Sequence, residues 1–258
     1  MTTSQDSTLD LTPAPQPAPV ARRWWAQSRL EWRLLMTNGE QILLTLIIPV
    51  AVLFAVTRLG LAEIDEATPG VMALAILSTA FTATAISTGF ERRSGVLKFL
   101  GATPLGRSGL LVGKTTATFA VIVVQMLLVT AVALLLGWSW TVAEPLVLIA
   151  TIVLGTVALG SWGFALAGLL RAEATLAVAN GIFLLLLFAG GTVLPTDRLP
   201  DALAGFVQFL PSAALGDALR TLMDAPSGGS GTPWGPILIL AAWAVGGIVV
   251  SVRTFRWE

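Results

Sequence analysis

The stretch ERRSGVLKFLGATPLGRSGLLVGK, residues Glu91 to Lys114, carries five of the chain's 15 basic residues and lies between two long apolar runs. Charge is scarce elsewhere, because only 12% of the 258 residues are charged and 55% are apolar. A typical soluble domain has about a quarter charged residues. The deficit indicates a chain surrounded by lipid. Its net charge of zero favours neither a nucleic acid nor an acidic substrate.

The chain contains no cysteine and no histidine. Without thiols it has no disulfide and no cysteine nucleophile, and without imidazoles it has no Ser-His triad and no histidine metal ligand. The composition therefore argues against an intramembrane hydrolase of the usual kinds. We expect no catalytic, metal or cofactor site in this chain.

Six apolar segments are long enough to cross a bilayer core, which needs about 20 residues of helix. They are approximately residues 39–59, 70–90, 109–136, 145–170, 174–194 and 234–252. The first 20 residues are polar and rich in proline and threonine, which predicts a disordered tail rather than a signal peptide. The sequence predicts an all-α membrane protein with one six-span domain over residues 21–258.

The distribution of lysine and arginine predicts the orientation. An even number of spans places both termini on one side, and that side receives every basic residue except Arg58, Arg198 and Arg220. Cytoplasmic loops of membrane proteins carry an excess of lysine and arginine. Both termini and the 91–114 loop are therefore predicted to be cytoplasmic, as in a plasma-membrane protein.

A helix over residues 91–100 is amphipathic. Glu91, Ser94, Gly95 and Lys98 fall on one face, and Val96, Leu97, Phe99 and Leu100 fall on the other. Gly101 and Pro104 end it. Such a helix suits the membrane interface or a groove on a soluble partner, and a plain topology signal is the alternative.

The run GLLVGKT, residues 109–115, is a near-match to a phosphate-binding loop. That motif requires glycine five residues before Gly113, after a strand, and the residue there is Ser108 in an apolar helical context. We therefore expect no ATP binding by this chain. Gly109 and Gly113 are instead expected to allow close helix approach, and Lys114 to extend toward the interface.

Two segments resemble the integral membrane subunits of type-2 ABC exporters, a family of drug, lipid and polysaccharide permeases. They are the 91–114 stretch and GGTVLPTDRLPDALAGFVQFLPSAALGDALRTL, residues 190–222. The resemblance implies a dimer of permeases driven by two separate ATPase subunits, which bind ATP and magnesium. It also implies that the loop helix is a coupling helix facing an ATPase rather than the bundle, through Glu91, Arg92, Arg93, Val96, Leu97, Lys98 and Leu100.

Residues 21–36 predict an amphipathic interfacial helix with tryptophan and arginine on adjacent sides. Arg29, Glu31 and Arg33 are candidate ATPase contacts, and membrane anchoring alone is the alternative. Candidate pathway-lining residues are Ser78, Thr82, Thr84, Ser87, Gln125 and Asn180, for which helix packing is the alternative. An apolar wall with hydroxyl groups suits a hydrophobic or amphiphilic substrate.

Between the fifth and sixth spans, residues 195–225 predict two short amphipathic helices separated at Pro211. An external gate there would use Phe206, Leu210, Leu215 and Leu219, and a surface lid is the alternative. No predicted span carries a charged residue near its middle, which disfavours an ion-coupled carrier. The rivals to an exporter permease are such a carrier and a non-transport membrane anchor or assembly protein with another cytosolic partner.

Overall fold

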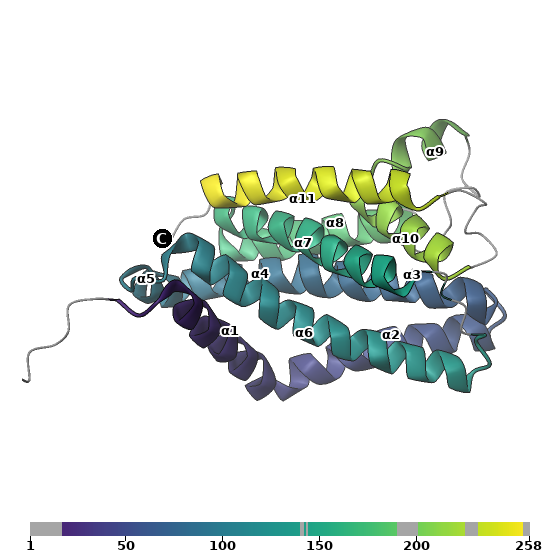
Figure 1. Ribbon diagram of the computed structural model, residues 1–258, viewed down its shortest axis with the longest axis horizontal. Coiled ribbons are helices and arrows are strands. Elements are labelled where there is room, and N and C mark those ends of the chain that lie inside the picture. Colours follow the sequence, from purple (N-terminus) through teal and green to yellow (C-terminus); the bar gives the residue numbers. More distant parts are fainter. Residues whose placement is uncertain (1–16, 140–141, 143, 190–200, 225–231, 255–258) are drawn as a thin grey trace, which may run out of the picture.

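The computed structural model describes residues 17–139, 142, 144–189, 201–224 and 232–254, and within these ranges all regular structure is helical (Figure 1). The elements are α1 (Val20–Thr37), α2 (Gly39–Arg58), α3 (Ile64–Ile76), the π-helix η1 (Leu77–Ala83), α4 (Thr84–Arg93), α5 (Val96–Gly101), α6 (Gly106–Leu135), α7 (Pro145–Leu169), α8 (Ala172–Ala189), α9 (Asp201–Val207), α10 (Pro211–Leu222) and α11 (Trp234–Thr254). The predicted tail lies almost entirely outside the described residues.

Among the described residues, four helical runs qualify as membrane spans by length and composition. They are Ile64–Arg93, which joins α3, η1 and α4, together with α6, α7 and α11. Helices α1 and α2 qualify only as a pair bent by 72°, which gives a fifth candidate. The apolar part of α8, Ala172–Phe188, is shorter. The structure confirms a multi-span helical protein with four or five candidate spans, and the six-span arrangement stays a prediction.

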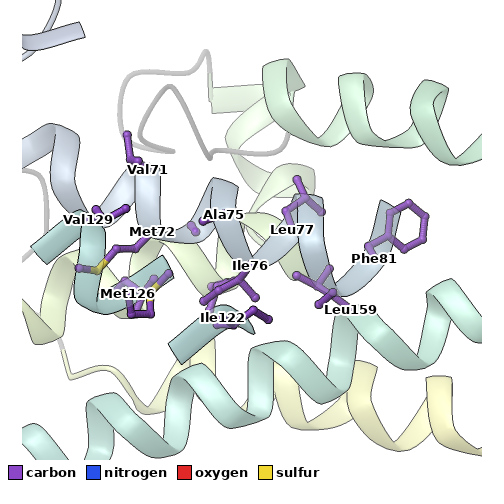
Figure 2. Close-up of a cluster of buried hydrophobic side chains, with 14 of the residues drawn as sticks. Val71, Met72, Ala75, Ile76, Leu77, Phe81, Ile122, Met126, Val129 and Leu159 are labelled. Atoms are coloured by element: carbon purple, nitrogen blue, oxygen red, sulfur yellow. The ribbon is translucent and has the colours of Figure 1, made fainter. Parts of the chain in front are cut away.

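The run Ile64–Arg93 forms the centre of the bundle, and most of its side chains are buried inside the protein. Figure 2 shows Val71, Met72 and Ile76 of this run beside Met126 and Val129 of α6. Leu159 of α7 belongs to the same cluster. A central helix contacts protein on every side, so the part of the run between its charged ends, residues 67–90, consists of apolar, small and hydroxyl-bearing residues all round.

A π-helix interrupts the central run over residues 77–83, where the sequence predicted an uninterrupted α-helix. Helix α7 crosses this turn at two glycines. A Cβ atom added at Gly163 would lie 2.7 Å from the Phe81 carbonyl oxygen, and one at Gly160 would lie 3.5 Å from that of Ala80. The contact at Gly163 is too close for any side chain, whereas the one at Gly160 is an ordinary van der Waals distance. Gly163 therefore lets α7 pack directly against the main chain of η1.

The predicted loop helix over 91–100 is two helices in the structure. Helix α4 ends at Arg93 and α5 begins at Val96, and Gly95 between them has φ +78°, in the left-handed region that favours glycine. The predicted apolar face is therefore wrong. Leu97 is fully buried, whereas Phe99 is 80% exposed. The break reorients α5 so that Leu97 packs against Leu110 of α6.

The predicted division at Pro211 is confirmed, since α9 ends at Val207 and proline occupies the first turn of α10. Helix α10 packs against α3, α7 and α11. Its Leu215 and Leu219 are fully buried, whereas Phe206 of α9 is 69% exposed. The four proposed gate residues therefore do not form one surface. Residues 195–200 and 225 of the predicted hairpin lie outside the described residues.

Candidate functional site

Lys114 of α6 is the centre of a buried ion cluster, which we call the Lys114 cluster. Its ammonium nitrogen lies 3.0 Å from Glu31 Oε2 of α1 and 2.6 Å from Glu91 Oε2 of α4. Gln27 Nε2 donates a hydrogen bond of 2.7 Å to the other oxygen of Glu31. The cluster, defined as Glu31, Glu91, Lys114 and Gln27, joins three helices at the loop end of the bundle.

The close approach of α1 to α6 comes from two glycines. A Cβ atom added at Gly113 would lie 2.5 Å from Gln27 Cγ, and one at Gly109 would lie 3.0 Å from the Trp24 ring. This confirms the predicted role of Gly109 and Gly113 in helix packing. The prediction for Lys114 is wrong, because only 6% of its side chain is exposed. Residues 108–115 all lie within α6, without the strand and open loop of a phosphate-binding motif.

The Lys114 cluster contains two carboxylates and one ammonium, so its formal net charge is −1. Charges in a low-dielectric interior are tolerated only when they are paired and hydrogen-bonded. Lys114 meets this condition by contacting both acids, and Gln27 satisfies part of Glu31. Glu91 keeps the most contact with solvent, with 26% of its side chain exposed.

Arg92 and Arg93, at the end of α4, also bond to neighbouring helices of the same chain. The Arg92 guanidinium donates a hydrogen bond of 2.8 Å to the Gly168 carbonyl and another to the Leu170 carbonyl, at the end of α7. Carbonyl groups in the last turn of a helix lack intrahelical donors, and a cation suits them. Arg93 pairs with Glu173 at the start of α8, and both side chains are exposed.

The predicted coupling residues therefore have different environments. Glu91 and Leu97 are held inside the protein, and Leu100 packs beside Leu97. Val96, Lys98 and Phe99 of α5 are exposed, and Phe99 was not among the predicted coupling residues. The signal for Phe99 was its spacing of three residues from Val96, which places both on one side of a short helix.

The three candidate ATPase contacts on α1 also separate. Arg29 and Arg33 are exposed, and the Arg29 guanidinium lies 5.4 Å from the centre of the Trp25 ring. Glu31 is buried in the Lys114 cluster. Only the two arginines are placed to contact another molecule. The sequence did not reveal the role of Lys114, because its partners Glu31 and Glu91 lie 83 and 23 positions away. Gln27 bonds to Glu31 four residues along the same helix, a spacing that could have indicated the pair.

A cavity of about 980 Å³ adjoins the Lys114 cluster. Five of the six candidate pathway residues line it: Ser78, Thr82, Thr84, Ser87 and Asn180. The sixth, Gln125, is buried elsewhere and bridges two elements. It accepts a hydrogen bond of 3.1 Å from the Thr79 hydroxyl and donates one of 2.9 Å to the Thr45 carbonyl. The geometry of Gln125 matches the packing alternative.

A second, wholly apolar cavity of about 370 Å³ lies between α7, α8 and α11. Leu210, a candidate gate residue, lines it, together with Trp162 and Trp243. The indole N–H groups of both tryptophans are satisfied, by the Trp243 carbonyl at 3.0 Å and the Phe209 carbonyl at 2.7 Å respectively. This cavity therefore presents no free polar group from its two tryptophans.

A sequence model of the family described as ABC-2 type transporter matches residues 21–223, which is most of the chain. The chain belongs to this family. The resemblance to the permease component of type-2 ABC transporters is thereby confirmed. No curated protein matches the chain. Membership makes the chain a multi-pass permease whose partner is an ABC ATPase, and this sets aside the anchor and the ion-coupled carrier.

Proposed function

We propose that this permease forms the translocation path of an ATP-driven exporter as a dimer. Two ATPase subunits bind ATP and magnesium, and the permease binds neither. The protein lies in the plasma membrane with both termini in the cytosol. Closure of the ATPase pair on ATP biases the permease dimer between inward-open and outward-open states.

The observation that carries this proposal is the short connection between the exposed part of the loop and the wall of the larger cavity. Helix α4 contributes Ser87 and Glu91 to that wall and continues after a two-residue break into α5. The Lys114 cluster fixes α4 to α1 and α6, and Arg92 fixes it to α7. A displacement of α5 by a partner would therefore move the cavity wall.

The distribution of charge supports the cytosolic orientation of this end. Helices α1 and α5 and the end of α11 lie together at one end of the bundle (Figure 1). That end carries Arg29, Arg33, Lys98, Arg107 and Arg253. An excess of basic residues is typical of the cytoplasmic side.

A second copy of the permease would cover the open side of the cavity. Leu44 and Ile48 of α2 line the cavity and are about half exposed. Half-exposed apolar side chains at the mouth of a cavity face either lipid or another protein surface. A dimer that places two such cavities together encloses one path between the copies.

Substitution of Phe99 by aspartate tests the coupling role. We expect Phe99→Asp to leave folding intact, because the side chain is exposed, and to reduce ATPase co-purification by about 30-fold or more, the loss typical of an interface anchor. Thr103→Asp, beyond α5, is the matched control. The measurement is ATPase bound per permease, with permease-dependent ATP hydrolysis, at matched membrane abundance.

Leu97→Asp separates contact with the partner from folding. Leu97 is fully buried, so this variant should lower membrane abundance instead of giving a folded permease that fails to bind. Normal ATPase binding and hydrolysis by Phe99→Asp would contradict the proposed docking surface.

A further inference from the structure

The larger cavity is long and follows the central run. Its lining extends from Ser78 in η1 to Ser94 after α4. Helix geometry makes that distance roughly 20 Å. The cavity therefore accepts a molecule much longer than a simple ion, with one end beside the Lys114 cluster and the other at the π-helix.

The charge of the cavity is concentrated at one end. Among the described residues that line it, the charged ones are Glu31, Glu91 and Lys114. The nearest arginines on the same helix are engaged elsewhere, Arg92 with carbonyl groups of α7 and Arg93 with Glu173. The end wall therefore has a formal charge of −1.

The accessible charge at this wall is the negative one. Glu91 has 26% of its side chain exposed, compared with 6% for Lys114 and 8% for Glu31. Lys114 already contacts both carboxylates, so its positive charge is neutralised within the cluster. A bound molecule would meet the partly uncompensated carboxylate of Glu91 first. A net negative charge in a partly dry site favours a cation.

The side walls are apolar with isolated hydroxyl groups. Leu34, Ile48 and Phe90 supply apolar surface, and Thr82 lines the cavity with a buried hydroxyl that has no hydrogen-bond partner. Buried polar groups in native proteins are usually paired. The Thr82 hydroxyl is an exception, but it is enclosed by protein, so the side walls offer a ligand mainly apolar surface.

We propose that this cavity binds an apolar or amphiphilic monovalent cation, with its charge beside Glu91 and its apolar body along α2 and the central run. This inference rests on the proposed function, because it names the class of molecule that the translocation path accepts. An apolar anion is disfavoured by Glu91, and a small inorganic cation leaves the apolar walls unfilled.

Two ions of matched shape and opposite charge test the proposal. Tetraphenylphosphonium and tetraphenylborate carry the same four phenyl groups and differ in the sign of their charge. The full chain is placed in nanodiscs of phosphatidylcholine, and binding of each labelled ion is measured at equilibrium against empty nanodiscs. We expect the dissociation constant of the cation to be about ten times lower than that of the anion, or lower still. One close charge pair is enough to produce this ratio.

Glu91→Gln removes the net charge of the cluster and keeps the side-chain shape. Lys114 then pairs one-to-one with Glu31, so the fold should survive. We expect this variant to lower the cation-to-anion ratio by about tenfold. Glu173→Gln is the matched control, because it removes an exposed carboxylate that does not line the cavity. It should leave the ratio unchanged.

Ala83→Phe tests the location without changing any charge. Ala83 lines the cavity away from the Lys114 cluster, and a phenyl ring there should weaken binding of both ions. Equal binding of the two ions by the unsubstituted chain would overturn the proposal. Cation preference that neither Glu91→Gln nor Ala83→Phe alters would also overturn it, because the ion would then lie elsewhere.

The two proposals fail in different ways. If the permease prefers the cation, Glu91→Gln removes that preference, and no ATPase is recruited, the cation site is supported and the proposed function is contradicted. ATPase recruitment that depends on Phe99, without any preference between the two ions, would contradict only the substrate class.

Discussion

The 91–114 loop and the segment α9–α10 both have amphipathic sequences, but different contacts hold them to the bundle. In the loop, charged and amide groups fix the chain to the bundle through the Lys114 cluster and Arg92, and α5 exposes Phe99 and Val96. In the other segment, α10 inserts its leucines into the core and contacts three helices. An amphipathic pattern therefore predicts a helix with one apolar side, but not what that side contacts.

Loss of the Lys114 charge should have the largest effect on stability. Lys114→Met leaves Glu31 and Glu91 together in a buried site without a cation, and breaking a buried pair in this way costs about 3 to 5 kcal/mol. The measurement is thermal unfolding in detergent, with membrane abundance.

A neutral version of the same cluster is the control. Lys114→Met combined with Glu31→Gln and Glu91→Gln contains no buried charge, and neutral replacement of buried ions is often tolerated. We expect most of the lost stability to return. Equal destabilisation in the single and the triple variant would show that packing, and not charge, holds the three helices together.

Truncation in α10 should have a smaller but clear effect. Leu215 is fully buried, and a Cβ atom at Gly155 of α7 would lie 2.7 Å from its Cδ1 atom. Leu215→Ala should lower the free energy of unfolding by about 2 kcal/mol. This is the low end of the range for a buried leucine, because in a membrane the unfolded state is itself surrounded by apolar lipid. Phe206→Ala, at an exposed position of α9, is the control for the same thermal measurement. Equal shifts in the two variants would contradict the inserted placement of α10.

The exposed pair of the loop should have the smallest effect. Arg93 and Glu173 have side chains 61% and 64% exposed, and exposed ion pairs contribute about 0 to 1 kcal/mol. We expect Arg93→Ala to leave the unfolding temperature nearly unchanged, at low and at high salt. A salt-sensitive loss of stability as large as that of Lys114→Met would contradict this expectation, because it would mean that the exposed ion pair also holds the loop in place.

The predicted spans illustrate what local sequence specifies. Residues 109–136 and 145–170 match α6 and α7 to within a few residues, because a helix long enough to cross a bilayer must be apolar along its whole length. The first and fifth spans are less well determined. Helix α2 qualifies only with α1, because hydropathy does not record a 72° bend, and α8 is short in its described part.

The sequence by itself determined the helical membrane class, the family, the break at Pro211 and the close approach at Gly109 and Gly113. Each of these depends on neighbours in the chain or on one residue's size. Only the tertiary structure decided that Leu97 points inward, that α7 packs on a π-helix, and that Lys114 pairs with Glu31 across 83 positions. Such pairings depend on how the helices pack. The spacing of apolar residues and the hydropathy of a segment do not indicate which other segment it will contact.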